Sequence, residues 1–251
     1  RNESWQYLQD LNFKEIKSKE KIKILIVGDS HAKDLFNAFI QNQDLFKKYE
    51  FLRYGEDKGN NNPINFTNKT TEKNLTQFGD SQIFKQSDVI LVSNYYNEKE
   101  GIEILDKFIN KFKKKKRIIL TTNSNIYFEP PNRFGLRLSL FDNFFLERNK
   151  NRIFLDKNLT PDDKYKIDNY YYKNRNLDEI NQINNQLQLI AKKHDIQILH
   201  KEDFQCNFSK KICYGVTDEG MKIHFDKGHF SLEGAKFFGK KIYESNWLKI
   251  N

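Results

Sequence analysis

The chain has 251 residues, a formal net charge of +9 at pH 7 and a hydrophobic fraction of 37%, which favour one large domain with its own core. No apolar run approaches the roughly 18 residues of a membrane-spanning helix, so we expect no membrane crossing within these residues. The densest basic run, residues 113–117, ends an expected helix, where cations complement the helix dipole. No nucleic-acid-binding module accompanies that run, and we therefore expect no nucleic-acid partner.

Five short apolar runs predict strands, and four longer amphipathic segments predict helices. The strands are expected at 23–27, 51–54, 88–94, 117–121 and 196–199, and the helices at 31–43, 99–115, 177–191 and 232–246. Their alternation predicts an α/β fold, a three-layer α/β/α sandwich around a mostly parallel five-stranded sheet. Ligands of such sheets bind outside the carboxyl ends of the strands, where Ser30 and Asn94 lie.

The other segments show no regular pattern. Residues 1–20 are polar and are expected to form a lead-in helix or linker before a single domain at 21–251. Residues 55–73 are polar and Asn-rich, and we expect a loop there. Residues 124–172 contain prolines, a glycine and many aromatic residues, and they are expected to be an irregular insertion that builds a substrate cleft.

The two cysteines, Cys206 and Cys213, have six residues between them. This spacing suits a small loop closed by a disulfide, and two cysteines alone are too few for a structural zinc site. A disulfide would indicate an oxidising, extracytoplasmic compartment, whereas two free thiols are the alternative.

A Gly28-Asp29-Ser30-His31 turn follows the first aliphatic strand and opens a helix. The first N–H groups of a helix have no partner within it, so a serine placed there lies beside donors that can stabilise an oxyanion. A serine hydroxyl becomes nucleophilic only with a base nearby. The simpler alternative is that Asp29 or Ser30 only caps the helix.

The base is expected near the other end of the chain, in Asp226-Lys227-Gly228-His229. His229 can accept the serine proton, and Asp226, three residues earlier, can orient the imidazole and favour its charged form. Taken alone, such a turn is more often an ordinary surface loop. The two turns together, at opposite ends of an α/β pattern, favour a serine-dependent acyl-transfer site.

These two turns resemble the first and last conserved blocks of the SGNH (GDSL-type) hydrolase superfamily. The ending Phe225-Asp226-Lys227-Gly228-His229-Phe230-Ser231-Leu232-Glu233-Gly234-Ala235, preceded by the cysteine pair, is similar to the SGNH domains fused to integral-membrane acyltransferases that O-acetylate bacterial surface polysaccharides. Phe230 stands where that family usually has leucine. The resemblance covers both ends of the chain and the strand order, but not residues 124–172.

The resemblance implies Ser30 as nucleophile, His229 as general base and Asp226 as its orienting carboxylate. It also implies an oxyanion hole made by the Ser30 backbone N–H, an asparagine and a glycine. Asn94 is the candidate asparagine, although Val92-Ser93-Asn94-Tyr95 departs from the usual Gly-x-Asn-Asp block. Gly55 is the candidate glycine, with Gly59 as a rival.

Several further residues are candidates for lesser roles. His31 and Tyr95 are expected to contact substrate, although His31 could equally pack at the helix start. Aromatic residues of the insertion could stack on sugar rings or simply pack the insertion: Phe128, Tyr170, Tyr171 and Tyr172. Three histidines lack metal-ligand spacing, so no metal or other cofactor is expected: His194, His200 and His224.

Together these features predict an extracytoplasmic O-acyltransferase, most simply an O-acetyltransferase, acting on a bacterial cell-envelope glycan through an acyl-serine intermediate. The resemblance implies a membrane acyltransferase domain in the same polypeptide and an acyl donor, most simply acetyl that ultimately comes from acetyl-CoA. The alternatives are a carbohydrate or lipid O-acyl esterase with the same three residues, and a catalytically silent glycan-binding module.

Overall fold

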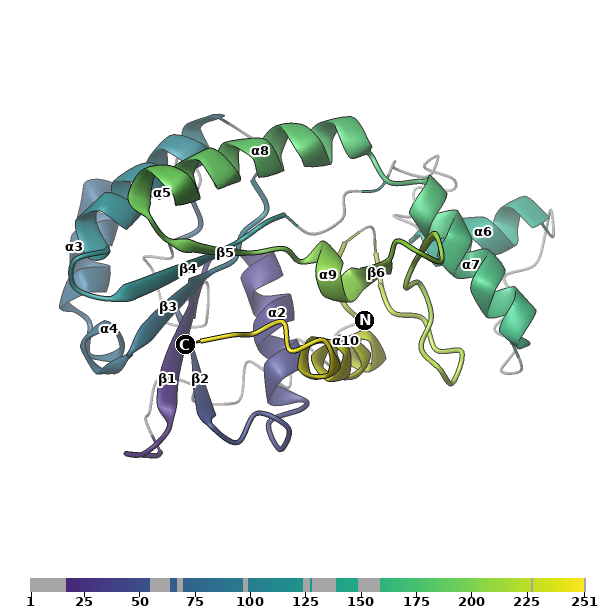
Figure 1. Ribbon diagram of the computed structural model, residues 1–251, viewed down its shortest axis with the longest axis horizontal. Coiled ribbons are helices and arrows are strands. Elements are labelled where there is room, and N and C mark those ends of the chain that lie inside the picture. The colour runs from purple at the N-terminus through teal and green to yellow at the C-terminus, as the bar shows by residue number, and fades with distance from the viewer. Residues whose placement is uncertain are drawn as a thin grey trace.

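Five parallel strands form the centre of the molecule (Figure 1). A computed structural model describes residues 17–54, 64–66, 70–96, 99–123, 127, 139–148, 159–226 and 228–250. The strands lie in the order β2-β1-β3-β4-β5, and every neighbouring pair is parallel. They are β1 (Ile22–Val27), β2 (Tyr49–Tyr54), β3 (Val89–Val92), β4 (Arg117–Thr121) and β5 (Gln197–Leu199). The predicted α/β class and five-stranded sheet are therefore confirmed.

Helices cover both faces of this sheet because successive side chains of each strand point to opposite faces. Ile24 and Ile26 of β1 share one core cluster with α2 (Ser30–Ile40) and α10 (Leu232–Glu244). Leu25 and Val27 belong to the other cluster. That second cluster includes residues of α3 (Glu72–Asp80), α4 (Gln82–Gln86), α5 (Lys99–Phe112) and α8 (Leu177–His194). Figure 1 shows the resulting layers, with α5 and α8 on the side opposite α2 and α10.

The segment expected to be irregular contains two helices, α6 (Leu140–Arg148) and α7 (Pro161–Lys173). The start of α7 carries a local signal, because Thr160 accepts a hydrogen bond from the Asp163 N–H and Pro161 opens the helix. Because most residues of α7 are polar, apolar periodicity does not predict this helix. A similar box at Thr71 and Asn74 begins α3, a helix that apolar periodicity does not predict.

A disulfide joins Cys206 and Cys213 across the short hairpin of β6 (Cys206–Asn207) and β7 (Ile212–Cys213), as predicted. The hairpin follows the short helix α9 (Glu202–Gln205) and packs against α7 in a third apolar cluster. The Asp168 carboxylate of α7 accepts the Gly215 N–H at 2.8 Å, which ties α7 to the chain after the hairpin. Figure 1 shows α6, α7 and the hairpin together at one end of the molecule.

At its beginning, the described chain is tied to the start of β2. The N–H groups of Lys17 and Ser18 donate to the Glu50 carboxylate at 2.6 and 3.1 Å. The rest of the expected lead-in, residues 1–16, and most of the expected 55–73 loop lie outside the described residues. None of the helices in the described ranges is both long and apolar enough to span a membrane.

Candidate active site

The Gly28-Asp29-Ser30 turn links β1 to α2 at the carboxyl end of the sheet. Gly28 has a φ of +143°, and a Cβ there would lie 1.8 Å from the Ser93 carbonyl oxygen, so only glycine fits. Asp29 caps α2, because its Oδ1 accepts the His31 N–H at 2.9 Å. Ser30 is the first residue of the helix, and its backbone N–H has no hydrogen-bond partner among the described residues. That N–H is free to stabilise an oxyanion.

The last loop brings a histidine to this serine. His229 Nε2 lies 2.8 Å from Ser30 Oγ, and His229 Nδ1 lies 3.1 Å from Asp226 Oδ1. The same Asp226 oxygen accepts the N–H groups of Gly228 and His229 at 3.0 and 2.9 Å. The carboxylate is therefore held in place by its own turn, and the three side chains form a serine–histidine–aspartate arrangement.

Packing of α10 against α2 carries the last loop to the first turn. Ser231 caps α10 by accepting the Gly234 N–H at 3.0 Å, directly after the histidine turn. A Cβ on Gly234 would lie 2.1 Å from the Ile223 carbonyl oxygen, and one on Gly239 would lie 2.2 Å from the Ala38 carbonyl oxygen of α2. Both close approaches require glycine: Gly234 lets the start of α10 lie against the chain at Ile223, and Gly239 sets how near α10 comes to α2.

The charges of the arrangement suit a base and its orienting group. Burial alone would raise the pKa of Asp226, but hydrogen bonds from the His229 ring and from the N–H groups of Gly228 and His229 hold it well below its usual range. Burial alone would lower the pKa of His229, but the Asp226 hydrogen bond and nearby negative charges raise it. The raised pKa makes neutral His229 a stronger proton acceptor and stabilises the imidazolium that forms when it takes a proton in acyl transfer.

Asn94 lies beside the nucleophile turn, and its side chain is fully buried. Its Oδ1 accepts the Asp29 N–H at 3.1 Å, and its Nδ2 donates to the Tyr95 carbonyl at 2.9 Å. This side chain therefore braces the residue before Ser30. Gly55 and Gly59, the candidate glycine donors, lie outside the described residues.

His31 and Tyr95 form an aromatic wall next to the reactive serine. Their rings stack with centroids 5.3 Å apart, and the His31 ring lies 5.0 Å from that of His229. The Tyr95 hydroxyl lies 3.2 Å from the Glu179 carboxylate of α8, which fixes the tyrosine. Burial and the positive charge of Lys201 lower the pKa of His31, so this ring is neutral at pH 7.

Two buried charged residues near the site are absent from the sequence-based set, Asp34 and Lys201. They are only 3% and 2% exposed. Asp34 lies among the buried residues of α2, most of which are apolar, and a carboxylate in such a segment is a signal that the sequence does contain. Lys201 follows β5 with no neighbouring pattern that would mark it. Of the aromatic residues of the insertion, Tyr171 is 1% exposed in the third apolar cluster, and Tyr170 and Tyr172 pack against that cluster, whereas Phe128 lies outside the described residues.

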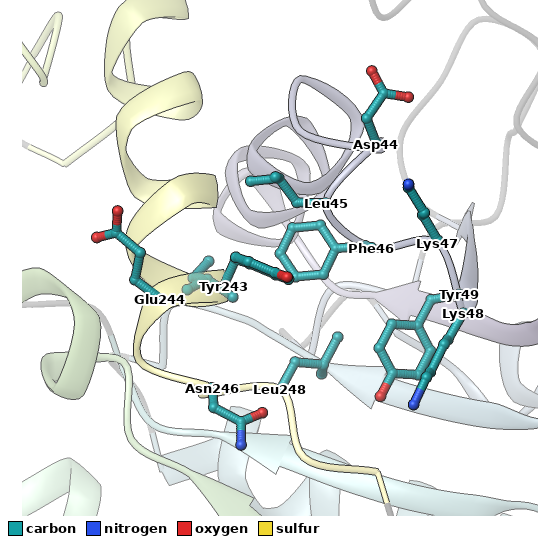
Figure 2. Close-up of a pocket in the computed structure, with 11 residues that line it drawn as sticks. Asp44, Leu45, Phe46, Lys47, Lys48, Tyr49, Tyr243, Glu244, Asn246 and Leu248 are labelled. Carbon is teal, nitrogen blue, oxygen red and sulfur yellow. The ribbon is translucent and has the colours of Figure 1, made fainter.

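A groove of about 740 Å³ lies elsewhere, between the α2–β2 connection and the end of α10 (Figure 2). Figure 2 shows Phe46 and Tyr243 facing each other, with ring centroids 5.8 Å apart. Tyr49 on its wall begins β2, so the groove is at the amino end of the parallel sheet, whereas Ser30 is at the carboxyl end. In the described part of the chain, no three metal-ligating side chains are grouped around a common point.

Comparison with known proteins places this geometry in a family. The fold is similar to that of a lipopolysaccharide acetyltransferase periplasmic domain from Salmonella ser. Paratyphi A, with a TM-score of 0.58, 20% identity and coverage of 91% of this chain and 85% of that one. A GDSL-like lipase from Bacteroides thetaiotaomicron aligns with a TM-score of 0.44, 14% identity and 96% coverage of both chains. No curated protein matches. The family described as the SGNH domain fused to AT3 domains matches residues 4–244, and the chain belongs to this family.

Proposed function

We propose that this chain is an extracytoplasmic O-acyltransferase domain that moves an acyl group, most simply acetyl, to a hydroxyl of a bacterial cell-envelope glycan. The observation that carries the proposal is the alignment of Ser30 Oγ, His229 and Asp226 through contacts of 2.8 and 3.1 Å. Nucleophile, base and orienting carboxylate are within hydrogen-bond reach of one another, which is the arrangement that nucleophilic acyl transfer requires.

The first half-reaction acylates the serine. Ser30 Oγ attacks the acyl carbonyl carbon while His229 Nε2 takes its proton, and the Ser30 N–H, with Asn94 and Gly55 as the other proposed donors, stabilises the oxyanion. The tetrahedral intermediate then collapses, the bond to the leaving group breaks, and His229 gives its proton to that group. The product is an acyl ester on Ser30.

The second half-reaction returns the enzyme to its starting state. His229 deprotonates a sugar hydroxyl, whose oxygen attacks the acyl-Ser30 carbonyl carbon. The ester bond to Ser30 Oγ breaks, and Ser30 recovers its proton from His229. With water in place of the sugar the same residues would make an esterase, so the acceptor decides between the two activities.

The disulfide and the family support the proposed location and partners. A structural disulfide is typical of extracytoplasmic proteins, and the hairpin of this chain carries one. The family is described as fused to AT3 domains, which supports an integral-membrane acyltransferase domain as the partner that presents the acyl group. The periplasmic lipopolysaccharide acetyltransferase domain of similar fold supports a surface polysaccharide as the acceptor class.

The test is acetylation of Ser30 by p-nitrophenyl acetate. The release of p-nitrophenol and the intact mass of the protein measure the reaction. We expect one acetyl group on the wild type and none on Ser30→Ala. Ser81→Ala is the matched control, because Ser81 also begins a helix and accepts a backbone N–H, yet has no histidine partner among the described residues. A folded wild type that is never acetylated would contradict the proposal and favour the silent glycan-binding module.

A soluble oligosaccharide added to the acetylated protein separates transfer from hydrolysis. Transfer predicts faster loss of the acetyl group and an acetylated sugar in the product mixture. Loss at an unchanged rate, with acetate as the only product, would make the chain an esterase.

A further inference from the structure

The Asp34 carboxyl is buried next to the proposed active site without a hydrogen bond. It lies one helical turn after Ser30 on α2 and is 3% exposed. Neither of its oxygens has a hydrogen-bond partner among the described residues. Buried polar groups are nearly always paired, so an unpaired carboxyl in the interior requires a functional or electrostatic explanation.

The charged groups around Asp34 come from three separate elements. His229 faces it from the last loop and, with the neighbouring Phe230 N–H, favours its ionised form. Asp226 of the same loop and Asp29 of the nucleophile turn oppose ionisation. Burial is the largest effect and raises the pKa of Asp34 to about 7. The carboxyl thus changes charge near neutrality, whereas Asp226 stays ionised.

Lys201 supplies a buried positive charge on the third side. It follows β5, its N–H donates to Thr122 Oγ1 at 3.0 Å, and its Nζ has no hydrogen-bond partner in the described ranges. Burial lowers the pKa of Lys201 to about 8, while the negative charges of Asp29 and Asp34 act in the opposite direction. The negative charge of Asp34 therefore favours the protonated form of Lys201 in the interior of the protein.

The effect of Asp34 reaches the reaction through His229. Burial lowers the pKa of His229, the Asp226 hydrogen bond raises it, and the negative charge of Asp34 is the next contribution that raises it. Two carboxylates therefore raise the His229 pKa, and they act in different ways. Asp226 binds Nδ1 and sets the ring orientation, whereas Asp34 makes no hydrogen bond to the ring in the described part of the chain and acts on it through its charge.

We propose that Asp34 is a positioning residue for the general base, and that its negative charge, balanced by buried Lys201, stabilises the imidazolium form of His229 during acyl transfer. The catalytic part of this inference rests on the proposed function, because in that reaction the imidazolium forms when His229 takes the Ser30 proton. The electrostatic part does not need turnover and can be measured separately.

The test is an NMR titration of the His229 imidazole in the whole chain. Asp34→Asn removes the charge with little change in shape, and we expect the His229 pKa to fall by about one unit. Asp34→Leu should also lower the His229 pKa, because the negative charge is absent in both variants. His31 and His224 also face His229, so their signals are assigned and followed separately.

Asp168→Asn is the matched control. Burial also raises the pKa of Asp168 to about 7, but this carboxyl lies on α7 and accepts the Gly215 N–H. Its replacement should leave the His229 titration unchanged. A His229 pKa that stays the same in folded Asp34→Asn or Asp34→Leu overturns the proposal. If neither variant folds, the His229 titration of the wild type tests the proposal. Coupling to Asp34 predicts a titration curve with two ionisations, and a curve with a single ionisation overturns the proposal.

Rates then test the catalytic part. With p-nitrophenyl acetate, Asp34→Asn should lower the plateau of kcat/KM by about tenfold, the rate equivalent of one pKa unit. The acid limb should move to lower pH, because His229 now loses its proton more readily. An unchanged plateau and limb overturn the catalytic part. Absence of acetyl-Ser30 in a wild type that shows the predicted titration overturns the proposed function instead, so the two failures are distinguishable.

Discussion

Replacing Gly28 by alanine should destabilise the chain and disable the site together. The new Cβ would lie 1.8 Å from the Ser93 carbonyl oxygen, where real Cβ contacts are not closer than 3.0 Å. The backbone on one side must therefore move by about 1 Å, a scale set by hard-sphere contact. In addition, the φ of +143° is strained for any residue with a Cβ, which costs about 1–2 kcal/mol.

The movement also breaks the hydrogen bonds that join the turn to the strand beside it. These are Ser93 N–H to Val27 O at 2.9 Å, Asp29 N–H to Asn94 Oδ1 at 3.1 Å, and Tyr95 N–H to Asp29 Oδ2 at 3.0 Å. Each contributes about 1 kcal/mol net. With the strain, we expect a loss of about 4 kcal/mol or more in the free energy of unfolding, which lowers Tm by roughly 8–16 °C for a chain of this size.

Circular dichroism melting and p-nitrophenyl acetate turnover measure the two consequences. Turnover of the folded fraction should fall by about 10², the usual effect of a 1 Å displacement at a reacting centre. Gly220→Ala is the control, because Gly220 also has a positive φ, +81°, but its Cβ would meet only ordinary contacts at 3.6 Å. It should cost only the φ strain of about 1 kcal/mol. A Gly28→Ala protein as stable as Gly220→Ala would refute the reasoning.

Three other outcomes are expected. Replacing both Cys206 and Cys213 by serine should lower the free energy of unfolding by about 2–3 kcal/mol, from the chain entropy of a short closed loop; melting with and without reductant measures this, and a wild-type Tm insensitive to full reduction would contradict it. Asp226→Asn should lower kcat by about 10²–10⁴ and move the acid limb of the rate profile to lower pH, because the carboxylate that raises the His229 pKa is gone. An unmoved limb in a folded, slower variant would count against that role. Burial raises the pKa of Asp168 to about 7, above the unfolded value, so its contribution to stability is present at pH 4 and is lost as the pH rises to 7. The stability of Asp168→Asn relative to wild type should therefore grow from pH 4 to pH 8 in denaturant titrations, and a constant difference would show that Asp168 does not titrate in this range.

Features that depend on neighbouring residues could be predicted from the sequence. The aliphatic run at Ile24–Val27 is fully buried in β1, because four apolar side chains in a strand require cover on both faces. The cap at Asp29 and the pairing of Asp226 with His229 are also local, since each joins residues no more than three positions apart. The disulfide closes a loop short enough that spacing alone predicted it.

The tertiary structure decided what comes from opposite ends of the chain. Ser30 and His229 are 199 positions apart, and they meet because α10 packs closely on α2, where Gly239 leaves room for the approach. The fold also buries Asp34 and Lys201, two residues whose local sequences do not indicate a shared role. Hydrogen bonds within a turn or helix and the periodicity of side chains involve residues a few positions apart, so they can be predicted from the order of residues in the sequence. Burial, and the pKa shifts that follow from it, depend on which distant surfaces close over a group, and no single segment encodes that.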